Sequence, residues 1–303
     1  MTRTILIGGS GRSGTNIVKE LLSQHSKTFS LPFEHRFTID PRGVIDFYNS
    51  FAQNWSPYYA DHKLEDLSAF LRMLSHKDEE REVYSGWELE EHFPRYTAHV
   101  DELIRSLKSF TYKGSWPGSD KEEMAFAPYR SQEELKPIFR TFFDNLIRGM
   151  LKRHGKELFV EDNTWNTLYA RELLDLIPDS KILHVVRDPR DVVASLTRQG
   201  WTPNELPQVI EWYRSVMRKW EHQKQLLAED EYLEVRLEDL VARKKETITK
   251  MCSFIGIEPE QTLSDFPLDK AHTGRWKQDF TPSQQETVTE ELSSHLEEYG
   301  YRA

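Results

Sequence analysis

The chain has 303 residues, of which 38% are hydrophobic and 30% are charged, and its formal net charge is −10. This composition is typical of a folded globular protein and excludes a disordered or low-complexity chain. The negative charge argues against a nucleic-acid-binding protein, because affinity for nucleic acid comes mainly from Lys and Arg side chains at phosphates.

The apolar runs and the cysteine content indicate the cellular location of the protein. No apolar run approaches the roughly 18 residues that cross a membrane, so we expect no integral membrane segment. The first apolar run, Thr4–Ile7, is shorter than a signal-peptide core of about 7–15 residues. Cys252 is the only cysteine, which excludes an intrachain disulfide and a thiolate metal cluster. We therefore expect a cytoplasmic protein.

The first 26 residues contain the pattern of a strand, a glycine-rich loop and a helix. The apolar, β-branched residues Thr4–Ile7 predict a buried strand that ends in glycines. The apolar residues that follow lie one helical turn apart, at Ile17, Val18, Leu21 and Leu22. They predict a helix that ends near Ser26.

The segment from about 37 to 150 is rich in aromatic and charged residues and lacks the alternation of strands. Helical spacing is present over Leu64–Leu74, Val100–Leu107 and Glu133–Leu151. These features predict a mostly helical insertion.

Alternating strands and helices return after residue 150. The predicted strands are Glu157–Val160, Lys181–Val186 and Tyr232–Leu237, and the predicted helices are Leu168–Ile177, Asp188–Leu196, about 209–220, 243–255 and 283–298. Such alternation indicates a parallel sheet flanked by helices. The sequence therefore predicts one α/β domain over residues 1–303, of the P-loop type, with the helical insertion inside it. His184, inside one predicted strand, is expected to be structural.

The loop Gly8–Thr15 reads GGSGRSGT and joins the first strand to the first helix. Glycines let the backbone approach an anion closely, and the helix N-terminus offers free N–H groups to a phosphate. The spacing of Gly9 and Gly14 matches that of a nucleoside triphosphate loop, but Thr15 stands where that loop has lysine. The basic residue is Arg12 instead. An ordinary strand–helix turn is the alternative.

A second segment, Arg187–Ser195, reads RDPRDVVAS. Arg187 follows a predicted strand, and Ser195 lies about two turns into the next helix. Ligands of such sheets bind at the carboxyl ends of the strands, so these two side chains are candidates for a further phosphate. The alternative is a strand–helix junction held by Arg–Asp pairs.

Together, GGSGRSGT and RDPRDVVAS resemble the two motifs with which the sulfotransferase family binds 3′-phosphoadenosine 5′-phosphosulfate (PAPS). The first is similar to the arginine version (RSGT) of the 5′-phosphosulfate loop, found in bacterial and tyrosylprotein sulfotransferases. The resemblance extends to the stretch Val235–Leu240 and to a late loop at Gly274–Trp276, but not to the insertion at 37–150.

The resemblance implies PAPS as co-substrate, PAP as product and transfer of sulfonate to a hydroxyl group of an acceptor, with no metal. It implies that the cofactor-binding residues are Gly11, Arg12, Ser13, Gly14, Thr15, Asn16, Arg187, Ser195, Gly274, Arg275 and Trp276. The segment Leu31–His35 is similar to the one that supplies a glutamate base, which makes Glu34 the expected catalytic base and His35 the second choice, with Arg12 acting on the leaving phosphate.

Two stretches depart from the family pattern. Leu237 stands where many relatives have a tyrosine that contacts the nucleotide. The segment Glu161–Asn166 resembles the family's E-K-T-P or D-T-P segment only loosely, so its alignment and its role stay open.

Two other functions compete with this interpretation. A small-molecule kinase of the P-loop type would require ATP and magnesium, and the missing loop lysine argues against it. A nucleotide-binding module without catalysis would bind PAPS or PAP and turn over no acceptor. The acceptor itself, whether a carbohydrate, a lipid or a small alcohol or phenol, is not specified by these motifs.

Overall fold

The computed structural model describes residues 3–117 and 121–302, which form two compact units. The first unit contains the described residues of segments 1–30, 160–171 and 179–303, and the second contains those of 31–159 and 172–178. The first unit holds both predicted phosphate motifs. The second holds the predicted insertion together with a few residues on either side of it.

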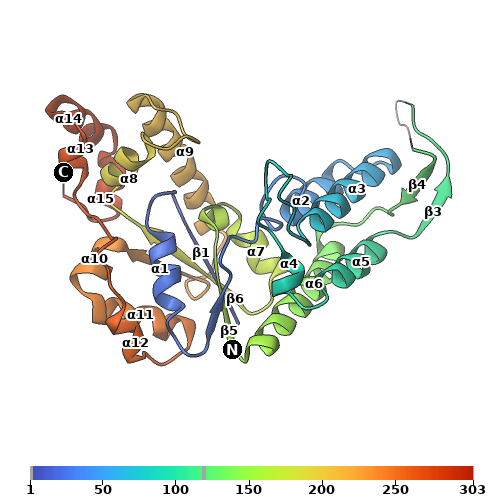
Figure 1. Cartoon of the computed structure of the whole chain (residues 1–303). Coiled ribbons are helices and arrows are strands. Elements are labelled where there is room, and N and C mark those ends of the chain that lie inside the picture. The colour runs from blue at the N-terminus through green and yellow to red at the C-terminus, as the bar shows by residue number, and fades with distance from the viewer. Residues whose placement is uncertain (1–2, 118–120, 303) are drawn as a thin grey trace. The chain divides into compact units, whose positions relative to one another are not determined.

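Within the described residues, five strands form the main sheet, in the order β2-β5-β1-β6-β7 (Figure 1). Their bounds are β1 Thr4–Gly9, β2 Thr28–Ser30, β5 Leu158–Asp162, β6 Ser180–Val186 and β7 Tyr232–Arg236. Strand β1 runs parallel to β6, with Ile7 opposite Leu183, and β6 runs parallel to β7. Because β1 and β6 are neighbours, the loops that follow them begin side by side.

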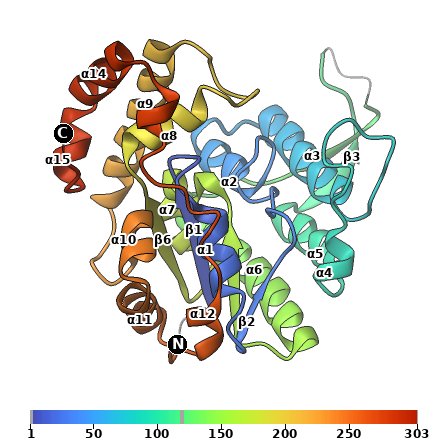
Figure 2. The same cartoon turned by 60° about the vertical axis from the view of Figure 1, so that its left-hand side comes forward.

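The sheet is flanked by helices, which confirms the predicted α/β class. Those of the first unit are α1 Thr15–Leu22, η1 Thr164–Tyr169, α8 Pro189–Leu196, α9 Leu206–Lys224, α10 Leu237–Ala242, α11 Lys244–Ile255, α12 Gln261–Asp265, α13 Trp276–Asp279, α14 Pro282–Glu291 and α15 Ser293–Glu298. Helix α7, Ala170–Leu176, crosses from the first unit to the second. Figure 2 shows α8 beside α9. Helix α8 contains most of the second motif.

Local sequence explains where α8 begins. The Asp188 carboxylate accepts a hydrogen bond from the backbone N–H of Arg190 at 2.9 Å, and Pro189 occupies the first helical turn. An N-terminal cap followed by proline is a strong helix start, since the fixed φ of proline already fits the helix. The predicted helix from Asp188 to Leu196 is therefore confirmed.

The second unit is mostly helical. It contains α2 Val44–Gln53, α3 Pro57–Met73, α4 Leu89–His92, α5 Tyr96–Leu107 and α6 Gln132–His154. Helix α6 begins with a capping box, in which the Ser131 side chain accepts from the N–H of Glu134 and the Glu134 side chain accepts from that of Ser131. Aromatic rings fill the core around Phe37, whose ring stacks on that of Phe143 at 6.0 Å.

Several sequence predictions need correction. The unit also contains an antiparallel hairpin, β3 Phe110–Lys113 and β4 Glu123–Phe126, where we predicted no strands. All four residues of β3 are exposed, so the burial that produces strand alternation is missing. Helix α1 ends at Leu22 rather than near Ser26, because residues 23–27 turn to enter the short strand β2. The predicted helix at 283–298 is broken into α14 and α15.

A buried polar cluster joins β6, β7 and α9. The Glu234 carboxylate accepts hydrogen bonds from Trp220 Nε1 at 3.0 Å and Lys224 Nζ at 2.9 Å, and lies 3.1 Å from His184 Nδ1. His184 is almost fully buried, as its place inside a predicted strand led us to expect. Burial alone would raise the pKa of Glu234, but the hydrogen bonds and charges of His184 and Lys224 outweigh it and lower the pKa to about 2.

We expect Glu234→Gln to lower the free energy of unfolding at pH 7. A carboxylate whose pKa is lower in the folded state stabilises the fold above its unfolded-state pKa of 4.5, and this contribution disappears as the pH falls toward about 2. The difference between wild type and variant should therefore shrink below pH 4.5, as measured by urea unfolding across pH 7 to 3. Glu229→Gln, at an exposed position, is the control. A pH-independent difference would contradict this account.

Candidate active site

The loop after β1 is tightly curled. Gly11, Arg12 and Gly14 all have positive φ, of 81°, 57° and 102°. For a non-glycine residue such as Arg12 this conformation is strained, and such strain clusters at ligand-binding sites. A Cβ atom on Gly9 would lie 2.1 Å from Ser13 Oγ and 2.9 Å from the carbonyl oxygen of Val185. Only glycine at position 9 lets the loop fold back over the strand ends.

Gly14 is the residue immediately before helix α1. A Cβ atom there would lie 3.0 Å from Leu237 Cδ2. Leu237 is buried at the start of α10 and packs against the loop. The position therefore supports the loop with an apolar contact. The contact joins parts of the chain far apart in sequence, so the sequence alone did not indicate it.

The loop presents hydrogen-bond donors that the protein itself leaves unused. Within residues 3–117 and 121–302, no backbone oxygen accepts from the N–H groups of Arg12, Ser13 or Gly14, and no group bonds the buried hydroxyl of Ser13. Buried polar groups normally have partners, so the buried Ser13 hydroxyl is a candidate to bond an oxygen atom of a ligand. A phosphate at a helix N-terminus would supply such an oxygen. Thr15 begins α1 and is buried, whereas Asn16 is exposed and donates to Glu20 at 3.0 Å.

The two predicted motifs contact each other directly. Arg12 Nε donates to Ser195 Oγ at 3.0 Å, which links the first loop to helix α8. Arg187 Nη1 donates to the backbone oxygen of Arg12 at 3.0 Å, and Arg187 Nη2 donates to that of His272 at 2.7 Å. In the described part of the chain, Arg187 Nε is buried and has no hydrogen-bond partner. Two arginines and a serine thus meet at the carboxyl ends of two neighbouring parallel strands.

The Arg–Asp pairs of the alternative interpretation are also present. Arg190 forms a close pair with Asp188, with Nη2 2.8 Å from Oδ2 and Nε 3.0 Å from Oδ1. Arg187 Nη2 lies 3.8 Å from Asp191 Oδ2. The segment therefore contains both the Arg–Asp pairs and an arginine that is placed to bind an anion. Arg190 holds the strand–helix junction, and Arg187 reaches across to the first loop.

Asp191 anchors the late loop that the sequence singled out. Its buried carboxylate accepts from the backbone N–H groups of Gly274 at 2.6 Å and Trp276 at 2.9 Å. The ring of Trp276 lies under the Arg190 guanidinium, 4.2 Å from its carbon. Arg275 is exposed, with Nη2 3.6 Å from Asp279 Oδ1. The structure brings this loop to the second motif through an aspartate that sequence reasoning did not single out.

The two candidate bases lie in the second unit. The Glu34 side chain is 32% exposed, and its Oε2 accepts from Arg36 Nη1 at 2.5 Å. Trp87 Nε1 donates to the Glu34 backbone oxygen at 2.8 Å. His35 is buried beside the rings of Phe37 and Phe159, and burial lowers its pKa to about 3. Of the two candidates, only Glu34 therefore presents a proton acceptor at the surface.

The segment Glu161–Asn166, whose role the sequence left open, is tied to the end of β1. Asn166 Nδ2 donates to the carbonyl oxygen of Ile7 at 2.9 Å. The Asn163 side chain accepts from the N–H of Trp165 at 3.0 Å and so caps η1. The segment places Thr164 beside the phosphate loop, with its Cγ2 3.7 Å from where a Cβ atom on Gly11 would lie.

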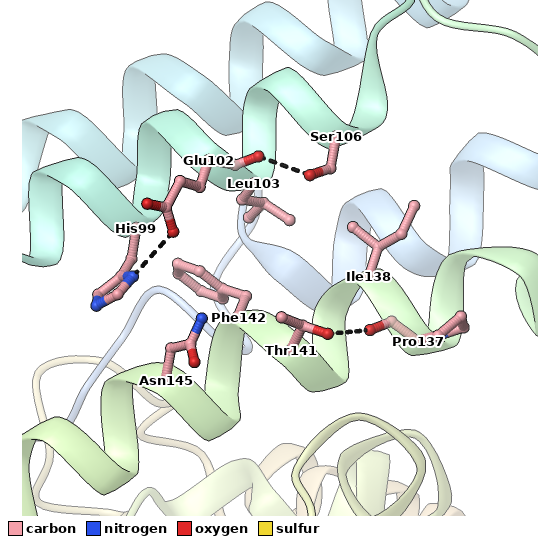
Figure 3. A pocket seen from close by; sticks show the side chains of 9 residues that line it. All are labelled: His99, Glu102, Leu103, Ser106, Pro137, Ile138, Thr141, Phe142 and Asn145. Atoms are coloured by element: carbon pink, nitrogen blue, oxygen red, sulfur yellow. Dashed lines mark hydrogen bonds and ion pairs between the residues drawn. The ribbon is translucent and has the colours of Figure 1, made fainter.

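A cavity of about 310 Å³ lies in the second unit, between α5 and α6 (Figure 3). Its lining includes His99, Glu102, Phe142 and Asn145, with His99 Nδ1 3.3 Å from Glu102 Oε2. No residue predicted to bind the nucleotide or to act as base lines it.

None of the helices described is long and apolar enough to cross a membrane. Across the described ranges, no three His, Cys, Asp or Glu side chains are grouped so that they could hold a metal ion.

Comparison with known proteins agrees with the two motifs. A sequence model of the sulfotransferase family matches residues 4–261. A comparison with curated protein sequences gives no significant match. Among solved structures, the sulfotransferase domain of the Synechococcus PCC 7002 olefin synthase is similar, with 17% identity, a TM-score of 0.53 and coverage of 100% of this chain and 96% of that one.

Two further bacterial structures are less similar. A sulfotransferase of Alicyclobacillus acidocaldarius has 15% identity and a TM-score of 0.47, covering 100% of this chain and 98% of that one. A sulfotransferase of Mycobacterium tuberculosis has 15% identity and a TM-score of 0.47, covering 97% of this chain and 77% of that one. The family match extends over both arginine motifs and most of the chain. The chain therefore belongs to the sulfotransferase family, the PAPS-dependent enzymes that its two motifs indicate.

Proposed function

We propose that this protein transfers a sulfonate group from PAPS to a hydroxyl of an acceptor and releases PAP. The observation that carries the proposal is the contact of Arg12, Ser195 and Arg187 at the ends of neighbouring strands. This arrangement offers two sites for anions, one in the curled loop and one beside helix α8. PAPS carries two such groups, the 5′-phosphosulfate and the 3′-phosphate.

The 5′-phosphosulfate belongs in the loop. The backbone of Gly11, Ser13 and Gly14, with the hydroxyls of Ser13 and Thr15, supplies the donors at the positive end of helix α1, and Asn16 stands next to them. The 3′-phosphate belongs with Arg187 and Ser195, where the unused Nε–H of Arg187 is available. The loop Gly274–Trp276 would cover the nucleotide from its anchor on Asp191.

The proposed mechanism uses positioning and charge, as phosphoryl transfer does. Arg12 stabilises the charge that develops on the leaving 5′-phosphate. Glu34 accepts the proton of the acceptor hydroxyl. We favour Glu34 over His35, because the histidine ring is buried and its lowered pKa makes it a poor proton acceptor. We assign no metal to this mechanism, since arginines and backbone amides supply the positive charge.

We treat residues 1–303 as one sulfotransferase-like domain in which the helical insertion at about 37–150 faces the acceptor. The acceptor is a hydroxyl-bearing carbohydrate, lipid, alcohol or phenol. A cytoplasmic location fits the single cysteine, Cys252, whose burial raises its pKa to about 11 and keeps the thiol protonated.

Thermal unfolding with PAP, ADP and ATP–magnesium at matched concentrations tests the proposal. A ligand that binds only the folded protein, at 100 times its dissociation constant, stabilises it by about 2.7 kcal/mol. We expect PAP to raise the unfolding temperature of wild type and to lose most of that effect in Arg187→Ala. ADP, which lacks the 3′-phosphate, should stabilise wild type less than PAP and should be little affected by the substitution.

Two further variants complete the test. Arg187→Lys should keep part of the PAP effect, because it retains the charge but not the planar fork. Arg214→Ala, which removes a surface pair with Glu291, should respond to PAP as wild type does. A protein stabilised by ATP–magnesium and not by PAP would instead be a kinase. Stabilisation by PAP without turnover of any acceptor would indicate a non-catalytic nucleotide-binding module.

A further inference from the structure

A tryptophan lies against the phosphate loop. Trp201 follows helix α8 and is 49% exposed, a large exposed area for an indole. A Cβ atom on Gly11 would lie 3.4 Å from Trp201 Cη2, 3.7 Å from Thr164 Cγ2 and 3.8 Å from Leu196 Cδ2. The indole therefore touches the loop residue that directly precedes Arg12, and part of its surface stays open to solvent.

Two other tryptophans hold Trp201 in place. Trp165 meets it edge to face, with ring centroids 6.3 Å apart and planes at 86°. Trp212 of helix α9 also packs against Trp201, with the ring centroids 6.3 Å apart. Edge-to-face packing of this kind fixes ring orientation. We call Trp165, Trp201 and Trp212 the tryptophan cluster.

The position of the cluster relative to the loop suggests what it contacts. Arg12 turns its side chain toward Ser195, and the unused backbone donors follow it in the chain, toward helix α1. Gly11 lies on the other side of Arg12 and faces Trp201, Thr164 and Leu196. The backbone N–H of Gly11 belongs to the phosphosulfate site, but the face on which a Cβ atom would stand is turned toward Trp201, and this face is left for the group that attacks the sulfonate.

The chemistry of this surface favours a flat apolar acceptor. The three atoms nearest to a Cβ atom on Gly11 would belong to an indole, a leucine side chain and the methyl group of Thr164. A carbohydrate buried there would leave hydroxyl groups without hydrogen-bond partners, which is costly. An aromatic ring gives up no hydrogen bonds with water when it is buried, and it gains a stacking contact with the indole. In the described part of the chain, Trp212 Nε1 is buried without a partner and is a potential donor to one polar group.

We propose that the exposed face of Trp201, held by Trp165 and Trp212, stacks on a planar aromatic ring of the acceptor, so that this enzyme sulfonates phenols in preference to sugars. The inference rests on the proposed function and goes further, since it names the acceptor class. It makes Trp201 a specificity-determining residue. Trp165 and Trp212 act through Trp201 and are positioning residues.

The test compares Trp201→Ala and Trp201→Phe with wild type, and Leu226→Ala is the control. Leu226 has a similar exposure of 48% and follows the far end of helix α9. With PAPS as donor, 2-naphthol, cyclohexanol and methyl β-D-glucoside are the acceptors, and the dissociation constant of PAP is measured separately by calorimetry. We expect kcat/KM for 2-naphthol to fall about tenfold in Trp201→Ala and to recover partly in Trp201→Phe. PAP affinity should stay within about twofold of wild type.

The outcomes separate the inference from the function on which it rests. A wild-type protein that does not bind PAP would remove the proposed function itself. PAP binding with equal turnover of 2-naphthol by wild type and Trp201→Ala would overturn the inference alone. Parallel losses of PAP affinity and turnover would mean that Trp201 contacts the nucleotide, which also overturns it. Preference of wild type for the glucoside or cyclohexanol would reject the phenol assignment.

A binding measurement covers the case in which no acceptor of the panel is turned over. Saturation-transfer NMR of 2-naphthol with the PAP-bound enzyme reports contact without chemistry. A signal from wild type that weakens in Trp201→Ala and stays in Leu226→Ala supports the inference. Absence of any signal from wild type overturns it.

Discussion

Arg12→Ala should lower kcat about 10³-fold, the upper end of the effect of removing one donor from a site of developing negative charge. Arg12 lies in the centre of the loop, exposed, with its Nε directed to Ser195. The leaving 5′-phosphate gains charge only as the bond to sulfonate breaks, so the loss should appear in kcat more than in PAP affinity. The measurement is release of PAP from PAPS with the best acceptor of a phenol and alcohol panel.

Two controls make this result interpretable. Arg12→Lys retains a positive charge without the planar fork and should retain more activity than the alanine variant. The unfolding temperature without ligand should stay close to that of wild type. Alanine adopts the positive φ of this position at about the same cost as arginine, and the side chain that is lost is exposed. A kcat close to wild type in Arg12→Ala would exclude the proposed role. A large drop in unfolding temperature would show that the arginine mainly holds the loop.

Glu34→Gln should lower kcat about 10²-fold, because a neutral amide cannot take the proton of the acceptor hydroxyl. The substitution preserves the size of the side chain and its ability to accept a hydrogen bond from Arg36. PAP affinity should be unchanged, since Glu34 is assigned to the acceptor. The measurement combines steady-state turnover with PAP binding on the same preparation.

The matched control is Asp40→Asn. Asp40 shares Arg36 with Glu34, at 2.9 Å from Arg36 Nε, and also accepts from the hydroxyl of Tyr84. This variant disturbs the same network but leaves the proposed base intact, so it should retain far more activity than Glu34→Gln. Equal losses in the two variants would assign the effect to the network. Full activity of Glu34→Gln, with a loss in a folded His35→Asn variant, would move the base to His35.

The parts of the fold that the sequence predicts well are those with strong local signals. Strand β1, its glycine loop, strand β6 and helix α8 follow from short apolar runs, glycines and the Asp188-Pro189 cap. The sequence also predicted both arginine motifs at the carboxyl ends of strands, but their contact depends on β1 lying beside β6, which the sequence did not indicate. The resemblance to the sulfotransferase motifs identified the family, and the family match over residues 4–261 confirms it.

The features that the sequence did not predict depend on contacts between distant residues. Strand β3 is exposed and shows no alternation, so its pairing with β4 leaves no trace in the pattern. Leu237 packs on Gly14 and Asp191 holds the N–H groups of Gly274 and Trp276, across many residues in each case. Nothing in the sequence distinguishes Trp201 from the other aromatic residues, and only the fold shows that it lies against Gly11.

The anchoring of the late loop bears on how far the chain can be shortened. The family match ends at residue 261, yet both N–H donors of the buried Asp191 carboxylate come from beyond that point. Arg190 likewise donates to the backbone oxygen of Arg302 at 2.8 Å, and the Tyr301 hydroxyl donates to Glu238 at 2.7 Å. A truncation at residue 261 would strand a buried negative charge beneath the second motif. Residues 274–302 thus supply contacts that hold the second motif in place, although the family match ends before them.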